Sequence, residues 1–373
     1  MHESSLVFGW QKWPFRIVAD TEFARVWADR TSLRQEIDRR LRRLNSLPHS
    51  TVQIIWADFG AGKSHTLRHI EARCVDEGNG MLVPIYTEVP VGTEGLLDLY
   101  RTLVGAVPED LLGQLARGVK SGVKRTPGTS GARDVRQALK LLASDDASGR
   151  SLALEWLQAS PGVPYLKALK AYGINGRVED DTRVVEILTE LFRLIREVRK
   201  DAVVIWLIDE FQRVADVPQR KRDGFSKSIV SLFNSCPAGL HFVLSFSVAQ
   251  QSTALALIPP DLRSRASTFP MLMLPHLSKS DCLAFSCDLF DTFRTAPRPE
   301  REYPFTPEAL ESLVDDLEAS TSGAVTPRLL MERLEAVLFE HYDTSGGEPA
   351  LPIAANQVVH LLNAIAARNE TQT

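Results

Sequence analysis

From residue 57 to residue 64 the chain reads Ala57-Asp58-Phe59-Gly60-Ala61-Gly62-Lys63-Ser64. This stretch follows an apolar run, Val52–Trp56, and precedes a segment of helical character, His65–Ala72. A strand, a glycine-rich turn and a helix start in this order are typical of a phosphate-binding loop, whose backbone N–H groups surround anionic oxygens. We therefore predict that residues 58–65 bind the phosphates of a nucleotide.

Two side chains of this loop have expected roles in such a site. Lys63 is expected to contact the β- and γ-phosphates, and the Ser64 hydroxyl to hold Mg²⁺. The pattern departs from the usual one in having Ala57 where a first glycine is common. Alanine is tolerated there if its φ is negative, whereas Gly60 and Gly62 lie where the backbone approaches phosphate closely. The alternative, a glycine-rich turn that arises by chance, does not explain the flanking strand and helix.

An acidic pair follows the apolar run Ala202–Ile208, which is typical of a parallel strand buried on both faces. Open α/β sheets bind ligands at the carboxyl ends of their strands, where this pair is expected to lie. We predict that Asp209 supports Mg²⁺ and that Glu210 polarises an attacking water. The alternative is that the two acids only begin a helix, since carboxylates favour helix N-termini. Together with the upstream loop, the pair indicates nucleotide hydrolysis.

Composition restricts the function only broadly. The chain has 44% hydrophobic and 24% charged residues, which is ordinary for a globular protein. Apolar stretches are too short to cross a bilayer and the N-terminus lacks a secretory signal pattern, so we expect a cytoplasmic protein without a membrane partner. The four cysteines have no CxxC spacing and are expected to be reduced thiols. The net charge of −4 leaves any nucleic-acid contact to local basic patches.

The alternation of apolar runs and amphipathic segments predicts an α/β fold with a parallel sheet. Pro84 favours a position toward the sheet edge, or a local bulge, for the second strand. A long helical tract, about residues 95–199, precedes the acidic strand. Within it Lys120–Gln137 is expected to be a mobile loop, because it is basic, carries glycine and serine, and is poor in apolar residues. Strands are expected at 52–56, 81–87, 202–208, 240–247 and 269–274; helices are expected at 31–44, 182–199 and 226–234, and after the start signals at Ser278 and Thr306-Pro307-Glu308.

The order of these motifs resembles that of AAA+ ATPases, particularly their origin-recognition and transposition-type branch, over nearly the whole chain. The resemblance implies a parallel-sheet P-loop NTPase domain at 1–277, with a helical insert at about 95–199, and an all-helical lid domain at 278–373. It implies that ATP and Mg²⁺ bind at Gly60–Ser64. In this family a polar residue at the tip of the strand after the acidic strand positions the lytic water. Ser247 matches that residue, with Ser245 as the alternative.

The same resemblance implies two catalytic arginines. Leu262-Arg263-Ser264-Arg265 is similar to the box that carries an arginine finger, and this match favours Arg265 over Arg263 as the residue that acts on a neighbouring subunit of a homo-oligomer. Gly323–Arg328 is similar to the start of a lid helix, and Arg328 would sense the γ-phosphate. A guanidinium suits both roles because it spreads phosphate charge over several donors. On spacing alone, a surface charge at a helix end is the favoured interpretation of each arginine.

Further resemblances cover shorter segments. Phe23–Arg30 resembles the stretch that lines the adenine pocket of these ATPases, with core packing as the alternative. The helical tract resembles ATP-binding proteins of bacterial BREX-type phage-exclusion systems, and the N-terminus resembles transposition ATPases. These likenesses imply an accessory ATPase that acts on or with DNA in bacterial defence, transposition or replication, with partner proteins of a multi-gene system. They rest on Trp156-Leu157, Leu166–Leu169, Tyr172-Gly173-Ile174 and Glu179–Asp181, and on Phe8-Gly9-Trp10 and Trp13-Pro14-Phe15.

Two basic segments, expected to be the loops Lys120–Arg136 and Arg220–Lys227, are the candidates for DNA contact, because flexible cations neutralise backbone phosphates. A solvated surface is the alternative for each. Without DNA binding, the alternative function is a nucleotide-dependent assembly switch that recruits or activates a partner protein; a P-loop kinase or transferase is the third. The cations concerned are Lys120, Lys124, Arg125, Arg133 and Arg136, and Arg213, Arg220, Lys221, Arg222 and Lys227.

Overall fold

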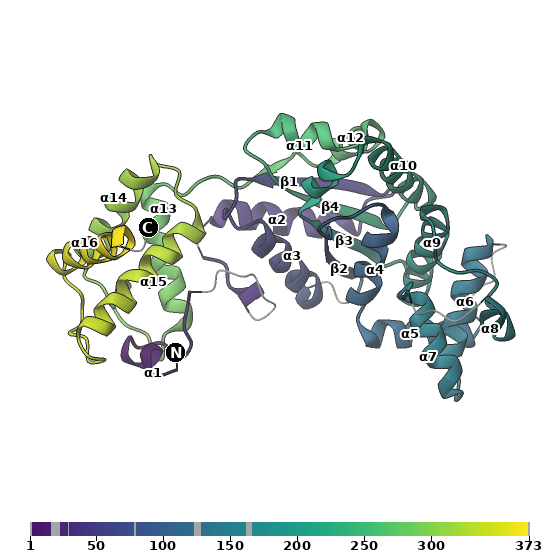
Figure 1. Cartoon of the computed structure of the whole chain (residues 1–373), viewed down its shortest axis with the longest axis horizontal. Helices are drawn as coiled ribbons and strands as arrows, with labels where there is room; N and C mark the ends of the chain where they lie inside the picture. The colour runs from purple at the N-terminus through teal and green to yellow at the C-terminus, as the bar shows by residue number, and fades with distance from the viewer. Residues whose placement is uncertain are drawn as a thin grey trace. The chain divides into compact units, whose positions relative to one another are not determined.

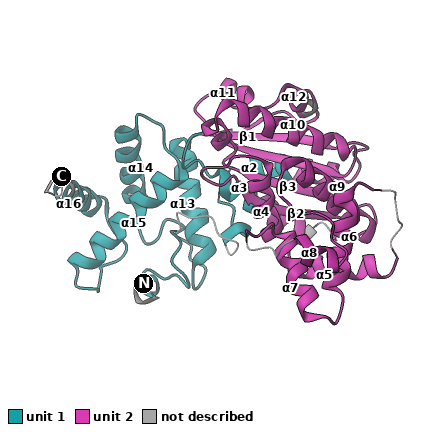
Figure 2. Ribbon diagram, turned by 45° about the vertical axis from the view of Figure 1, so that its right-hand side comes forward, with its two compact units in different colours: residues 1–37, 58–69, 274–373 teal, residues 38–57, 70–273 magenta. Residues whose placement is uncertain are grey.

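The computed structural model describes residues 2–15, 23–28, 30–77, 80–122, 128–161 and 166–371. The chain divides into two units, which Figure 2 distinguishes by colour. Unit 1 contains residues 1–37, 58–69 and 274–373, and unit 2 contains residues 38–57 and 70–273. The domain boundary expected after residue 277 remains a prediction.

Within the described residues, unit 2 contains a five-stranded sheet in the order β2-β3-β4-β1-β5 (Figure 1). Neighbouring strands pair in parallel, which confirms the expected α/β fold with a parallel sheet. The register pairs Glu88 with Asp209 and Ala57 with Ser247, so these strands end at the same edge. The strand bounds are β1 Thr51–Ala57, β2 Leu82–Glu88, β3 Val203–Asp209, β4 Leu240–Ser247 and β5 Leu272–Met273.

The inner strands are buried on both faces, as their continuous apolar runs predict. Trp206 on β3 and Phe242 on β4 are fully buried and meet edge to face, with ring centroids 5.5 Å apart. β2 lies at the sheet edge, as Pro84 predicts, since proline has no N–H for a central ladder. β5 is shorter than the expected strand at 269–274, because Pro270 and Pro275 flank it and cannot donate to the ladder.

Helices separate β2 from β3, as expected for the tract at 95–199. α9 (Asp181–Val198) matches the amphipathic helix predicted at 182–199, and the Asp180 carboxylate caps it by accepting from the Arg183 N–H at 2.8 Å. Trp156, one of the residues that resemble BREX-type proteins, is fully buried here, and its indole N–H donates to the Gly176 carbonyl at 2.7 Å. The other bounds are α4 Leu96–Ala106, α5 Glu109–Lys120, α6 Ser130–Leu142, α7 Ala147–Leu157 and α8 Leu166–Ala171.

The prediction of a loop at Lys120–Arg136 was wrong from Ser130 onward, where the chain is helical, while residues 121–122 and 128–129 are outside helices and 123–127 are not described. α5 continues to Lys120, and α6 begins at Ser130 after Thr129, whose hydroxyl accepts from the Ala132 N–H at 3.3 Å. The buried apolar face of α6 holds the segment in a helix despite its glycine and serine. Arg133 and Arg136 therefore lie on a helix, and Arg136 pairs with Glu190 at 2.5 Å. Two further candidate cations, Lys124 and Arg125, lie outside the described residues.

The segment Arg220–Lys227 is not a loop either. α10 runs from Gln219 to Ser235 and starts after Pro218, which is earlier than the helix expected at 226–234. Phe225 and Ile229 on its inner face are buried, so packing extends the helix toward its charged start. After β4 the chain forms α11 (Gln251–Leu257), α12 (Pro260–Arg265) and η3 (Ala266–Thr268).

Unit 1 contains a helical C-terminal region with its own apolar core. Ser278 caps α13 in a capping box with Asp281, and Thr306 caps α14, so both predicted start signals are confirmed. The N-terminal aromatic residues join this core: Trp13 stacks on Phe339 with centroids 4.9 Å apart. The bounds are α1 His2–Val7, η1 Phe23–Arg25, α13 Lys279–Phe293, α14 Pro307–Thr321, α15 Pro327–Thr344 and α16 Ala355–Thr371; α2 (Thr31–Leu44) and α3 (Lys63–Glu77) begin in unit 1 and end in unit 2.

In the described part of the chain, no helix combines the length and the apolar character that crossing a membrane requires. The cysteines Cys74, Cys236, Cys282 and Cys287 are buried free thiols, as predicted from their spacing. Burial raises the pKa of the Cys236 thiol to about 12, which keeps it protonated and unreactive at neutral pH.

Asp134 on α6 is expected to be essential for the stability of the helical tract. Its fully buried carboxylate accepts from the backbone N–H groups of Asn175 and Gly176, each at 3.0 Å, and pairs with Arg183. Asp134→Ala leaves these backbone donors unsatisfied and removes the buried carboxylate partner of the Arg183 guanidinium. We expect the free energy of unfolding, measured by urea denaturation, to fall by about 3–5 kcal/mol.

Arg133→Ala, at an exposed position of the same helix, is the matched control and should change stability by less than about 0.5 kcal/mol. Equal losses for the two variants would contradict the role assigned to Asp134.

Candidate functional site

The phosphate loop of unit 1 has the backbone that its sequence predicts. Gly60 and Gly62 have φ of +79° and +94°, a region that side-chain-bearing residues avoid. Ala57 is the last residue of β1 and is paired with Ser247, so an extended alanine suffices where a first glycine is common. α3 begins at Lys63, and the Thr66 N–H donates to the Gly62 carbonyl at 2.8 Å. The glycines allow the loop to curve, and the N-terminus of α3 follows directly. The backbone N–H groups of such an arrangement are suited to a phosphate group.

The Lys63 side chain turns back along this loop. It is 5% exposed, and its ammonium group donates to the Asp58 carbonyl at 2.5 Å. Ser64 follows it in the first turn of α3, and Ala61 is fully buried. The imidazole of His65, the last predicted contact, has its Nε2 2.7 Å from the Val26 carbonyl. The structure therefore gathers the residues from Asp58 to His65 into one turn, while their contacts with a nucleotide remain predictions.

The loop contacts the start of α15 within unit 1. The Arg328 N–H donates to the Gly60 carbonyl at 3.4 Å, and its guanidinium lies over the Phe59 ring, 4.5 Å from the centroid. A Cβ added at Gly60 would lie only 3.1 Å from the hydroxyl oxygen of Thr326, the residue that caps α15. His276 Nε2 lies 2.9 Å from the Asp58 carboxylate. The predicted lid arginine thus lies at the phosphate loop, although its role remains a prediction.

Arg30 is a further neighbour of the loop. This residue has φ of +49°, and its guanidinium donates to the Ala61 carbonyl at 2.8 Å and to the Pro275 carbonyl. Around it, Trp27 packs on His69 with ring centroids 4.6 Å apart, and Phe23 stacks on Phe293 at 4.8 Å. These contacts agree with the core-packing alternative, and the adenine pocket at Phe23–Arg30 remains a prediction.

In unit 2 the acidic pair lies at the carboxyl edge of the sheet. The Asp209 carboxylate is buried, and one of its oxygens accepts from the Ser245 hydroxyl and from the Glu210 N–H at 2.9 Å. The other oxygen accepts from the Tyr86 hydroxyl at 2.9 Å. Hydrogen-bond donors thus compensate the burial of this carboxylate.

Glu210 has a different environment from its neighbour. Its backbone is in the left-handed region, with φ of 55°, and it begins η2 (Phe211–Asp216) instead of continuing the strand. Its carboxylate accepts from the Ser247 hydroxyl at 3.1 Å and from the Gln212 amide at 2.6 Å. The two serines are thereby distinguished: Ser247 contacts Glu210, whereas Ser245 contacts Asp209.

Two partners of the acidic pair were missed in the sequence. Tyr86 lies on β2, and only strand order places it beside β3. Gln212 is two residues from Glu210, a spacing that neither a strand nor a regular helix turns into a contact. The left-handed residue Glu210 makes the contact possible, and no pattern in the sequence predicts that conformation.

The predicted arginine finger belongs to α12. Arg265 is the last residue of that helix, and its side chain lies outside the described residues. The alternative, Arg263, donates from Nε to the carbonyl of Ile258 at 2.8 Å. Ile258 is the residue that follows the end of α11. The assignment of Arg265 in preference to Arg263 therefore remains a prediction.

A metal site formed by protein groups alone is absent from the described residues, in which no group of three or more His, Cys, Asp and Glu side chains has a suitable arrangement. Ser64 and Asp209 remain the predicted protein groups.

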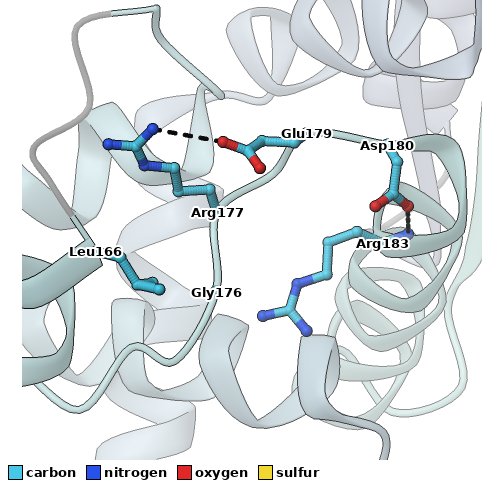
Figure 3. A pocket seen from close by; sticks show the side chains of 6 residues that line it. All are labelled: Leu166, Gly176, Arg177, Glu179, Asp180 and Arg183. Atoms are coloured by element: carbon cyan, nitrogen blue, oxygen red, sulfur yellow. Dashed lines mark hydrogen bonds and ion pairs between the residues drawn. The ribbon is translucent and has the colours of Figure 1, made fainter.

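A pocket of about 580 Å³ lies in the helical tract of unit 2, where Arg177 and Arg183 face it together with Glu179 and Asp180 (Figure 3). Both guanidiniums already have carboxylate partners: Arg177 pairs with Glu179 at 3.4 Å, and Arg183 pairs with Asp134. Because its charges are balanced within the protein, we assign no ligand to this pocket.

No protein-family model matches the chain, and no curated protein matches it in sequence. Among solved structures, it is similar to the ORC2 protein of Aeropyrum pernix with ADPNP and ADP, with a TM-score of 0.51, 14% identity and coverage of 90% of this chain and 67% of that one. For the ADP form of that protein, the TM-score is 0.52 and the identity 14%, with coverage of 91% of this chain and 69% of that one. For the ORC1 protein of the same organism, in complex with DNA, the TM-score is 0.50 and the identity 12%, with coverage of 91% of this chain and 66% of that one.

The chain spans about two thirds of the length of these proteins. At this identity the likeness concerns the fold. It shows an α/β fold with a parallel sheet and a helical C-terminal region, as the order of motifs predicts.

A comparison of two glycines tests the packing of the phosphate loop. Gly60 and Gly80 have similar φ, +79° and +76°, but a Cβ meets the α15 cap only at Gly60 and open space at Gly80. Gly80→Ala should cost about 1–2 kcal/mol for the left-handed backbone. Gly60→Ala should cost about 1–3 kcal/mol more through overpacking. Thermal unfolding measures the stability of both variants. Similar midpoint temperatures for Gly60→Ala and Gly80→Ala would show that the loop does not pack on α15.

Proposed function

We propose that the chain is an AAA+ ATPase that hydrolyses ATP with Mg²⁺ in a homo-oligomer. The observation that supports this proposal most strongly is the phosphate loop, in which Gly60 and Gly62 have positive φ and α3 begins at Lys63. The AAA+ fold and the hydrogen-bonded Glu210 agree with it. A P-loop kinase or transferase is disfavoured, because a water-activating acid fits hydrolysis without an acceptor molecule.

Each residue of the loop would have a simple electrostatic task. Backbone N–H groups of residues 60–64 would hold the phosphates, and Lys63 would neutralise charge on the β- and γ-phosphates. Ser64 and Asp209 would hold Mg²⁺, which when bound supplies positive charge beside the phosphate oxygens. These contacts account for binding and orientation, which form the larger part of phosphoryl-transfer catalysis.

Glu210 would be the base for the reaction. A water attacks the γ-phosphorus, the bond from that phosphorus to the bridging oxygen of ADP breaks, and the water proton passes to the Glu210 carboxylate. Ser247 donates to that carboxylate and would help to orient the water. Arg328 from α15, and Arg265 from a neighbouring subunit, would stabilise the charge of the transition state.

Glu210→Gln tests this assignment, because glutamine keeps the shape of the side chain but cannot accept the proton. We expect ATP binding close to wild type and a steady-state hydrolysis rate at least about 100-fold lower. Lys63→Ala is the control for the binding site, and its nucleotide affinity should fall instead. Wild-type turnover by Glu210→Gln would refute the mechanism, and wild-type affinity of Lys63→Ala would refute the binding site.

There are two candidates for the process that ATP hydrolysis would drive. We propose that the ATPase acts on or with DNA in bacterial defence, transposition or replication, together with proteins of a multi-gene system. Exposed Arg220 and Lys227 on α10 support direct DNA contact, whereas Lys221 is paired with Glu94 at 2.7 Å. The A. pernix ORC1 protein, which has a similar fold, was solved with DNA. The alternative, an assembly switch that recruits a partner protein, is favoured by the contact of the phosphate loop with α15.

An electrophoretic shift with nonspecific duplex DNA, with and without ATP, separates these candidates. If Arg220 and Lys227 contact phosphates, Arg220→Ala/Lys227→Ala should weaken binding and reduce the slope of log affinity against log salt by about 2. Lys140→Ala/Lys170→Ala removes the same charge from exposed positions elsewhere and should leave the slope unchanged. No shift at low salt would exclude direct DNA contact and favour the switch.

A further inference from the structure

Gln212 links the acidic strand to the end of β4. Its Nε2 donates to one carboxylate oxygen of Glu210 at 2.6 Å, and its Oε1 accepts from the Ser247 N–H at 2.9 Å. Ser247 in turn donates from its hydroxyl to the other carboxylate oxygen of Glu210 at 3.1 Å. The three residues therefore form a closed ring of hydrogen bonds in which both oxygens of the carboxylate are held.

The orientation of the Gln212 amide follows from its partners. A backbone N–H can only donate, so the amide oxygen must face Ser247. The amide nitrogen must then face the ionised carboxylate, which only accepts. A glutamine satisfies both neighbours at once because it carries a donor and an acceptor on one rigid plane.

The backbone around Gln212 is anchored on both sides of the ring. Phe211 is buried and packs against Phe246 of β4 at 5.4 Å between centroids, and Val214 is buried one turn later. The left-handed conformation of Glu210 turns the chain out of the strand and lets residue 212 face back toward residue 210. A strained residue persists only where its surroundings hold it, and such residues cluster at functional sites.

The neighbouring cation does not replace this restraint. Arg213 Nη2 lies 3.8 Å from Glu210, beyond hydrogen-bond distance. The same guanidinium instead pairs with Glu88 at 2.6 Å and donates to the Val89 carbonyl at 2.8 Å. Position and angle of the Glu210 carboxylate are thus set by Gln212 and Ser247.

We propose that Gln212 is a positioning residue for hydrolysis, which holds the Glu210 carboxylate at the angle from which it takes the water proton. This inference rests on the proposed role of Glu210 as the base. A base that is free to rotate spends only part of its time in the reactive geometry, so the restraint raises kcat without contributing to ATP binding.

The first test is Gln212→Met, which keeps the length of the side chain and removes both hydrogen bonds. We expect kcat to fall roughly 10- to 100-fold, the effect of losing a hydrogen bond to a charged group, with KM for ATP unchanged. Gln219→Met makes the same change at an exposed position of α10 and should leave kcat at the wild-type value. A wild-type kcat for Gln212→Met would overturn the proposal.

The second test separates the two bonds of Gln212 and includes a measurement without turnover. Gln212→Glu keeps an acceptor for the Ser247 N–H but turns a carboxylate oxygen toward Glu210, where it repels. Amide hydrogen exchange at Ser247, followed without nucleotide, should remain slow in Gln212→Glu and become faster in Gln212→Met. The kcat of Gln212→Glu should nevertheless fall at least as far as that of Gln212→Met; a wild-type kcat, or unchanged exchange in Gln212→Met, would overturn the proposal.

The outcome for Gln212 is distinguishable from the outcome for the proposed function. If Glu210→Gln hydrolyses ATP at the wild-type rate, Glu210 is not the base and the proposed mechanism fails. If Glu210→Gln is inactive while Gln212→Met and Gln212→Glu turn over normally, the mechanism stands and only the role of Gln212 is wrong.

Discussion

The parallel register of β1, β3 and β4 is the constraint on which the acidic site depends. Because Ala57 pairs with Ser247, and Ile208 pairs with Leu244, the ends of these strands meet at one edge of the sheet. Side chains alternate along a strand, so a shift of one residue would turn Ser245 and Ser247 to the opposite face. Buried aromatic contacts such as Trp206 with Phe242 make such a shift costly. The hydrogen bonds of Asp209 and Glu210 are therefore a consequence of core packing.

The phosphate loop depends on a different constraint, which is the conformational freedom of the backbone. Gly60 and Gly62 adopt φ values that other residues avoid, and this curvature ends where α3 begins. The same curvature brings the Gly60 carbonyl to the Arg328 N–H and leaves no room for a Cβ beside Thr326. If a nucleotide binds here as proposed, α15 is one of the elements of unit 1 that contact the loop beside it.

Charge in the helical tract is used within the protein. Arg136 and Arg193 both pair with Glu190, and Arg183 pairs with Asp134. Some of the basic residues that suggest a DNA-binding surface therefore form ion pairs inside the protein. The packing of α6 against α9 brings these pairs together. Most of these guanidiniums are shielded from solvent, which lowers the number of cations that remain for a polyanion.

The amino-acid sequence was sufficient for features that depend on near neighbours along the chain. α2 and β4 have the predicted bounds, because a 3.6-residue or continuous apolar pattern is a local property. The glycine-rich loop, the buried acidic strand and the helix caps at Ser278 and Thr306 are local in the same sense. The helices at 130–136 and 220–227 were wrongly expected to be loops, because composition alone does not show whether a weakly apolar stretch has a partner to pack on.

The contacts that distinguish Asp209 from Glu210 could be identified only from the tertiary structure. Ser247 and Glu210 are 37 residues apart in sequence, and Tyr86 and Asp209 are 123 apart. The chain alone left Ser245 and Ser247 as alternatives and did not indicate Gln212. These contacts depend on strand order and on one left-handed residue, and both are set by the free energy of the whole packed sheet, which no short stretch of residues encodes.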